Sequence, residues 1–128
     1  MAGTYAERIA AALINCGFRF QKEYEFLKKR KYRFDFLILG FKGRDLLKEG
    51  IRIAVEYEGG IVEKGRHMRP KGYNSDCQKY NLAALNGYLM LRYTARTIGR
   101  NNGEYLVPAQ IEQLIQQIDE KFKKEVHR

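Results

Sequence analysis

One predicted helix lies between two predicted strands, and this order restricts the fold more than any other feature of the sequence. The segment before the helix, IRIAVEYE at 51–58, alternates as a half-buried strand does, and YLMLRYT at 88–94 follows it as a second strand. The helix between them, at 76–86, ends at Gly87. Two strands joined through a helix lie parallel when they pair, because the helix carries the chain back along the sheet. The sequence therefore predicts at least one parallel pair.

The rest of the chain predicts further strands and covering helices in a single domain. A helical pattern over 4–16 stops at Gly17, strands are expected at 18–27 and 31–39, and Pro108 opens a last amphipathic helix. In the strand at 31–39, the expected faces are Tyr32, Phe34, Phe36 and Ile38 on one side and Arg33, Asp35, Leu37 and Leu39 on the other. We predict an α/β fold over residues 1–128, with a mixed sheet of about four to five strands flanked by helices.

The chain carries a strong positive charge for its size. Its 128 residues include 24 Lys and Arg against 15 Asp and Glu, which gives a formal net charge of +9. Such an excess favours a polyanion partner, most often nucleic acid, although a basic protein without a specific partner can have the same composition. No apolar run approaches the roughly 20 residues needed to cross a bilayer, and the first residues lack a signal-peptide pattern. We therefore expect no membrane association and a cytoplasmic location.

Carboxylates gather at the end of the IRIAVEYE strand. Glu56 and Glu58 share a face because side chains alternate along a strand, and Asp35 joins them if its own strand pairs alongside. Carboxylates at close range repel, so either one takes up a proton or a cation lies between them. Oxygen ligands of this kind suit Mg²⁺ or Mn²⁺. The alternative is that both glutamates are solvated on an exposed face and pair with Arg33 and Arg52.

Glu7 is a fourth acidic candidate, and two roles compete for it. It lies three residues after Thr4, which is the spacing of a helix capping box. Its carboxylate is available as a further metal ligand only if it does not cap the helix. Capping is the more common role of this pattern.

Several short motifs occur in an order that resembles one nuclease superfamily. In chain order they are RFDF, VEYEGG, a loop histidine and DCQKYNLAALNGYLMLRYT. This order resembles the PD-(D/E)XK superfamily, which has the restriction-endonuclease-like fold. The resemblance is greatest to its short members related to very-short-patch repair endonucleases and to their bacterial and phage relatives. It covers roughly residues 4–94.

The resemblance implies a magnesium-dependent nuclease and a set of site residues. The implied catalytic residues are Asp35, Glu56, Glu58, His67 and Lys79, and the implied metal ligands are Asp35, Glu56, Glu58 and Glu7. In this comparison, Asp76 and Lys79 match a helix pair of the superfamily and lie three residues apart, so they share a helix face. The implied cofactor is Mg²⁺ or Mn²⁺.

The sequence departs from the superfamily at one catalytic position. A lysine usually stands where this chain has Glu58. Some restriction enzymes also carry E-x-E and cleave DNA, so two possibilities stay open. Either Glu58 is the general base, or Lys79 or His67 fills the space of the missing lysine. The zinc ligands of very-short-patch repair enzymes are not evident, so mismatch repair is not supported.

Basic residues flank the acidic motifs on both sides. A predicted loop over 59–75 contains one group of them, and the run LKKRKYR ends just before Asp35. A loop of this length is often functional, although exposed loop residues and a solvated basic turn have the same composition. The residues expected to contact nucleic-acid phosphates are Arg33, Arg66, Arg69 and Lys71.

The leading functional hypothesis is a Mg²⁺-dependent deoxyribonuclease of a bacterial or phage-infected cell, in which activated water attacks a phosphodiester bond. The chain is too short to add a separate target-recognition domain to the nuclease core. This favours structure-selective or weakly specific cutting, or a partner protein that supplies specificity. A homodimer formed through the last helix is a further expectation for the partner. The alternative is a non-catalytic nucleic-acid-binding module on the same fold.

Overall fold

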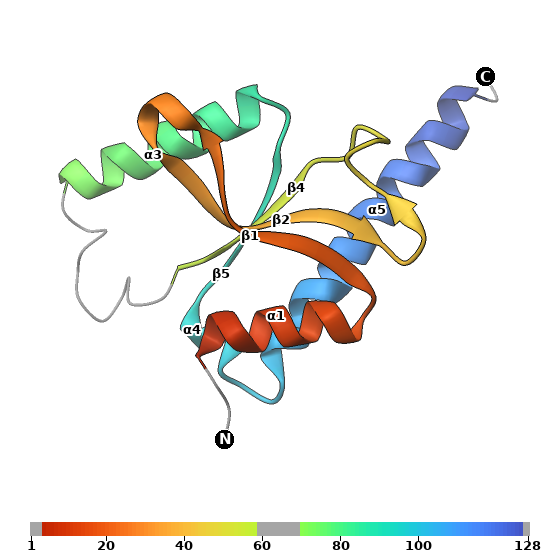
Figure 1. Cartoon of the computed structure of the whole chain (residues 1–128), viewed down its shortest axis with the longest axis horizontal. Coiled ribbons are helices and arrows are strands. Elements are labelled where there is room, and N and C mark those ends of the chain that lie inside the picture. Colours follow the sequence, from red (N-terminus) through yellow and green to blue (C-terminus); the bar gives the residue numbers. More distant parts are fainter. Residues whose placement is uncertain (1–3, 59–69, 127–128) are drawn as a thin grey trace.

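The protein is an α/β fold in which helices flank a central sheet (Figure 1). The computed structural model describes residues 4–58 and 70–126, and in the second range it describes side chains from residue 74 onward. The elements in chain order are α1 (Tyr5–Asn15), β1 (Phe18–Leu27), a 3₁₀ turn (Lys28–Arg30), β2 (Tyr32–Phe41), β3 (Arg44–Asp45), β4 (Ile53–Tyr57), α3 (Pro70–Leu85), β5 (Leu89–Tyr93), α4 (Ala95–Ile98), a second 3₁₀ turn (Gly103–Tyr105) and α5 (Leu106–Val126).

The sheet is mixed and has five strands. Its order is β1-β2-β4-β5, and the short strand β3 pairs with β2. All pairings are antiparallel except that of β4 with β5, which are parallel and are connected through α3. The predicted mixed sheet and its parallel pair are therefore confirmed.

The larger hydrophobic core lies between the sheet and helices α1 and α5. Its buried residues include Ile9 of α1, Ile53 and Val55 of β4, and Ile111 of α5. Helix α3 covers the opposite face, where Ala83 lies in a smaller second core (Figure 1). Each face of the sheet is thus closed by helices, as the consecutive buried residues Ile53, Ala54 and Val55 of β4 require.

The β1–β2 hairpin twists so far that its two ends pack in different cores. Phe36 belongs to the core beneath α1 and α5, whereas Phe34 belongs to the core beneath α3. The prediction that these two rings share one face is therefore wrong. On the partner strand, the residue between their pairing positions is Glu23, which has a left-handed φ of 53°. A residue in this conformation turns the strand locally, so the hairpin tip is carried across to α3 (Figure 1).

The helices differ most from the prediction at their first residues. α3 begins at Pro70 rather than at 76, so the loop predicted over 59–75 is too long. Proline is well suited to a first helical turn, but the Gly, Asn and Ser residues that follow it are weak helix formers and obscure the start. α5 begins at Leu106, slightly before Pro108. None of the helices in the described ranges is both long and apolar enough to span a membrane.

We predict that Gly103→Ala destabilises the protein by about 1–3 kcal/mol, whereas Gly43→Ala has little effect. A Cβ at Gly103 would overlap the backbone carbonyl oxygens of Thr97 and Ile98, which cannot move aside as a side-chain end can. A Cβ at Gly43 would meet no heavy atom within 4 Å. Urea unfolding of both variants measures the difference, and equal loss of stability in the two would contradict the packing at Gly103.

Candidate active site

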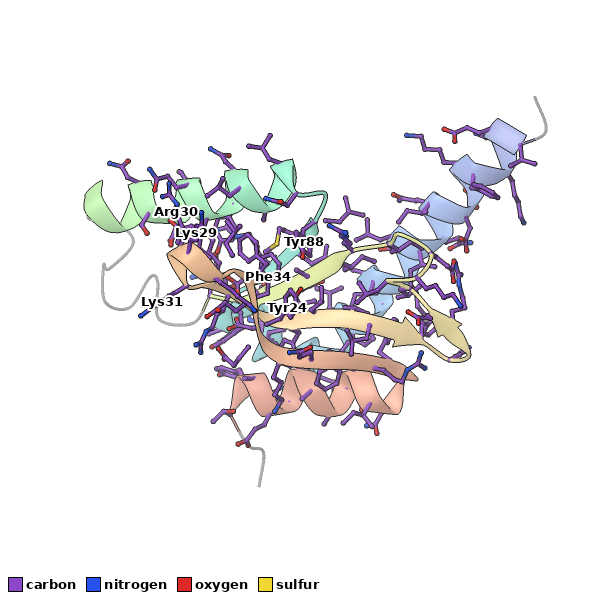
Figure 2. All side chains as sticks on the ribbon, turned by 45° about the horizontal axis from the view of Figure 1, so that its top comes forward. Tyr24, Lys29, Arg30, Lys31, Phe34 and Tyr88 are labelled. Atoms are coloured by element: carbon purple, nitrogen blue, oxygen red, sulfur yellow. The ribbon has the colours of Figure 1, made fainter. Side chains whose placement is uncertain are left out.

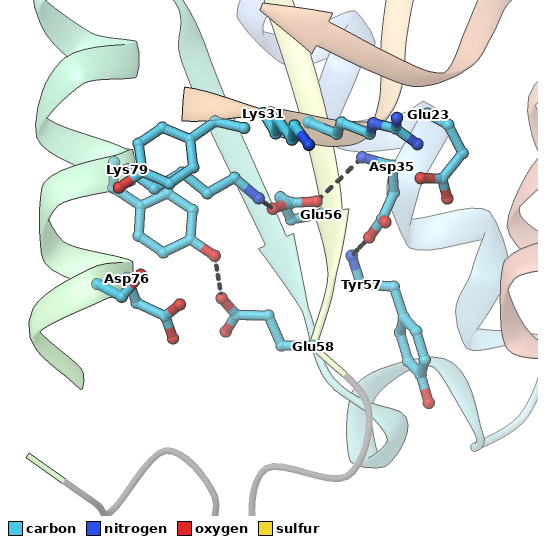
Figure 3. A pocket seen from close by; sticks show the side chains of 12 residues that line it. Glu23, Lys31, Asp35, Glu56, Tyr57, Glu58, Asp76 and Lys79 are labelled. Carbon is cyan, nitrogen blue, oxygen red and sulfur yellow. Dashed lines mark hydrogen bonds and ion pairs between the residues drawn. The ribbon is translucent and has the colours of Figure 1, made fainter. Parts of the chain in front are cut away.

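Asp35 and Glu56 meet where strands β2 and β4 stop pairing. The ladder between these strands ends at Phe36 and Val55. Beyond it, the Asp35 amide donates to Glu56 Oε2 at 3.0 Å, and the Tyr57 amide donates to Asp35 Oδ2 at 2.7 Å. The carboxylates thus satisfy backbone amides that the ladder leaves open, and these bonds hold them side by side (Figure 3). The expected convergence of Asp35 and Glu56 is present.

Glu56 is buried beside a cation from helix α3. It is 6% exposed, and Lys79 Nζ donates to its Oε1 (Figure 3). Burial raises the pKa of Glu56 to about 7; the Lys79 hydrogen bond opposes this rise, and the nearby charge of Asp35 adds to it. Near neutral pH, Glu56 is therefore poised between binding a proton and remaining ionised beside a cation.

Glu58 belongs to a separate cluster next to this pair. Its Oε1 accepts from the Tyr80 hydroxyl at 2.5 Å and from Arg92 Nε at 2.7 Å. The Arg92 guanidinium also lies over the Tyr80 ring, 4.0 Å from its centre. Burial and the hydrogen bond to Glu58 raise the pKa of Tyr80, so the phenol stays protonated as a donor. Glu58 is thus bound by one residue of α3 and one of β5.

The alternative in which both glutamates are solvated and pair with Arg33 and Arg52 is wrong. The Glu56 and Glu58 side chains are only 7% and 12% exposed. Arg33 instead pairs with Glu25 on the other strand of the hairpin, at 3.6 Å. Arg52 donates to the carbonyl oxygen of Asn86 at the end of α3. Cations from α3 and β5 take the places that these arginines were expected to fill.

A pocket of about 440 Å³ lies between β2, β4 and α3, and its lining includes both the Asp35–Glu56 pair and Glu58 (Figure 3). Asp76 and Lys79, which were expected to share a helix face, both line it. Glu23 and Lys31 also line it and were not identified from the sequence. Both have a left-handed φ, 53° at Glu23 and 55° at Lys31. Strand alternation cannot place such residues, because it assumes extended backbone throughout.

The remaining predicted site residues lie elsewhere or outside the description. Glu7 closes the capping box of α1: its Oε2 accepts from the Thr4 amide and its amide donates to Thr4 Oγ1, each at 3.1 Å. Of the two roles considered for Glu7, capping is therefore the one that the structure contains, and Glu7 does not line the pocket. Outside the described residues lie Arg66, His67 and Arg69, together with the side chain of Lys71.

The two adjacent carboxylates suit a hard divalent cation by their chemistry. Asp35 and Glu56 present oxygen donors of the kind that Mg²⁺ and Mn²⁺ bind, and a cation would relieve the burial of the Glu56 charge. Over residues 4–58 and 70–126, no three His, Cys, Asp or Glu side chains are grouped so that they could hold a metal ion. Glu58 lines the same pocket as Asp35 and Glu56, and its Oε1 accepts from Tyr80 and Arg92.

Comparisons with known proteins identify no relative of this chain. No protein-family model matches it, no curated protein matches it, and no solved structure matches it.

We predict that Glu56 makes the protein less stable as the pH rises. Its folded pKa of about 7 lies above the ordinary 4.5, so the folded state binds the proton more tightly than the unfolded chain does. The stabilisation is complete below about pH 4.5 and is lost as the pH rises through about 7. Relative to Glu56→Gln, wild type should lose up to about 3 kcal/mol across this window.

Urea unfolding of both proteins at a series of pH values tests this expectation. Glu120→Gln on the exposed face of α5 controls for the loss of one carboxylate. A constant stability difference between wild type and Glu56→Gln over the whole series would show that Glu56 titrates as it does in the unfolded chain.

Proposed function

We propose that this protein is a metal-dependent nuclease of the PD-(D/E)XK type that hydrolyses phosphodiester bonds in DNA. One observation carries the proposal: Asp35 and the buried Glu56 lie side by side at the end of the sheet, with the Lys79 ammonium against Glu56. Phosphodiester hydrolysis needs positive charge where negative charge develops and a group that activates water. A net charge of +9 favours the approach of a polyanion such as DNA.

The backbone prepares the two carboxylates for their role. Asp35 and Glu56 would hold a Mg²⁺ or Mn²⁺ ion, which supplies Lewis-acid activation of water and neutralises charge on the phosphate. The Tyr57 amide orients Asp35, and the Asp35 amide orients Glu56. Each amide stabilises the ionised form of the carboxylate that it contacts. The pair is therefore preorganised rather than assembled when a ligand arrives.

We assign to Lys79 the role that the superfamily gives to a lysine at the position of Glu58. Its side chain is 18% exposed, lines the pocket and donates to Glu56. An ammonium at this place can orient a water molecule or bind a phosphate oxygen. Glu58 connects α3 to β5 instead, because Tyr80 and Arg92 both donate to its Oε1. We infer that Glu58 is a positioning residue that keeps α3, and with it Lys79, against the site.

A nucleic-acid-binding module without catalysis is the alternative function. The observation in its favour is that Lys79 and Glu56 already neutralise one another, as the two partners of a buried structural ion pair do. A module of this kind binds DNA with strong salt dependence and leaves it intact in the presence of divalent cations.

Asp35→Asn should lower cation-dependent nicking of supercoiled plasmid by about 100-fold or more, whereas Glu7→Gln should cut at nearly the wild-type rate. Asparagine keeps an acceptor for the Tyr57 amide but lacks the charge, and glutamine preserves the capping box. Gel assays with Mg²⁺, Mn²⁺ or EDTA measure the rates. Equal nicking by Asp35→Asn and wild type would rule out the proposed site, and salt-sensitive binding without any nicking would favour the module.

Lys79→Gln should lower the nicking rate by about 100-fold, and Glu58→Gln by about 10-fold or less. The first change removes the ammonium from the pocket, whereas the second keeps acceptors for Tyr80 and Arg92 and weakens only the connection between α3 and β5. Single-turnover rates over a range of pH, with thermal midpoints as a folding control, separate the two effects. A folded Glu58→Gln variant as inactive as Asp35→Asn would instead assign the general base to Glu58.

A further inference from the structure

Four consecutive cations form the tip of the β1–β2 hairpin. Lys28, Lys29 and Arg30 make the 3₁₀ turn, Lys31 follows, and all four are exposed. Figure 2 labels Lys29, Arg30 and Lys31. With the carboxylates of the described residues, none of the four forms an ion pair. These four residues, called the cationic tip below, differ in this respect from Lys79, which is paired.

The cationic tip borders the carboxylate pocket. Lys31 lines that pocket together with Asp35 and Glu56. On the other side, Arg30 Nη1 lies 3.5 Å from Gln78 Oε1 on helix α3. Positive charge that no described carboxylate neutralises therefore lies directly beside the site proposed to cleave a phosphodiester.

Aromatic rings pack against one another at the base of the cationic tip. Phe26 and Phe34, one on each strand of the hairpin, stack with ring centres 4.1 Å apart and planes within 3° of parallel. Tyr88, just before β5, meets both rings at steep angles. Phe26 and Tyr32, which lie close to the tip in the chain on either side of it, also stack, with ring centres 6.1 Å apart. A tip held in this way loses little conformational freedom when it binds a ligand.

Lys31 has a left-handed backbone, with φ 55° and ψ 30°. This conformation is unfavourable for residues with a Cβ and free of that penalty for glycine. The chain thus carries a long cationic side chain at a position where glycine would be more stable. A residue held in an unfavourable backbone conformation leads to the hypothesis that its side chain has a function.

We propose that the cationic tip binds the phosphate backbone of a nucleic acid on the side of the pocket formed by α3. The choice of a polynucleotide rests on the proposed nuclease function. An anionic membrane fits less well, because interfacial segments combine cations with exposed apolar side chains, and no large apolar side chain of residues 24–33 is among the exposed ones. Spaced phosphates match spaced cations, and their binding releases condensed counterions.

Two triple variants with the same net charge test the location of binding. Lys28→Gln, Lys29→Gln and Arg30→Gln alter the cationic tip, and the matched control alters three exposed lysines of α5: Lys121→Gln, Lys123→Gln and Lys124→Gln. Fluorescence anisotropy with a short labelled DNA duplex in EDTA measures affinity without hydrolysis. The tip variant should bind about 10-fold or more weakly, with a shallower salt dependence by about 0.9 per lost phosphate contact. Equal losses in both variants, or none in either, would overturn the proposal.

Lys31→Gly separates binding from stability. Relief of the left-handed backbone should raise the thermal midpoint, while loss of the cation should weaken duplex binding. A solvated turn without a ligand predicts higher stability and unchanged affinity, which would overturn the role of Lys31. Binding to phosphatidylserine vesicles but not to the duplex would overturn the choice of nucleic acid.

The same measurements keep this proposal distinct from the nuclease proposal. If plasmid nicking fails while the tip variant alone loses duplex binding, the nuclease proposal falls and the binding surface stands. If nicking occurs and the tip variant binds the duplex as wild type does, the binding surface falls and the nuclease proposal stands.

Discussion

The burial of Glu56 beside Asp35 is the constraint on which the rest of the structure depends. Two carboxylates on neighbouring inner strands of the sheet repel, and one of them is almost inaccessible to water. Hydrogen bonds offset the free-energy cost of this burial and repulsion. Backbone amides of β2 and β4 donate to the two carboxylates, and the Lys79 ammonium donates to Glu56. Lys79 can reach Glu56 because α3 covers the face of the sheet on which Ala54 and Glu56 lie, and the β4–α3–β5 crossover brings the helix to that face. The crossover helix therefore also supplies the cation that binds the buried Glu56.

A second set of contacts keeps that helix in place. The Tyr80 ring on α3 is adjacent to Lys79 in the chain, and its hydroxyl donates to Glu58 while Arg92 of β5 lies over its face. The contacts of Glu58 thus join the end of β4 to both elements that follow it. Under the proposed function, Glu58 therefore acts through the position of α3 rather than on the substrate. In this way an E-x-E sequence keeps an ammonium, that of Lys79, beside the pair proposed to bind the metal.

Sequence patterns predicted what depends on local periodicity and missed what depends on unusual backbone or distant contacts. Alternation along β4 placed Glu56 and Glu58 on one face, and the helix between two strands predicted the parallel pair. The split of Phe34 and Phe36 between two cores depends on Glu23 at positive φ, where the sequence shows an ordinary strand residue. The contact of Lys79 with Glu56 joins residues far apart in the chain, so spacing alone did not predict it.

The twist of the hairpin places positive charge beside the carboxylates of the proposed active site. A pocket lined by several carboxylates repels a polyanion unless that charge is compensated nearby. Arg92 compensates Glu58, and Lys79 or a proton compensates Glu56 near neutral pH. Without the twist near Glu23, the hairpin tip would continue away from α3, and its cations would lie far from the carboxylates. Because the strand turns, Lys31 reaches the wall of the same pocket. One local departure from extended backbone thus brings the acidic site and a surface suited to phosphate together.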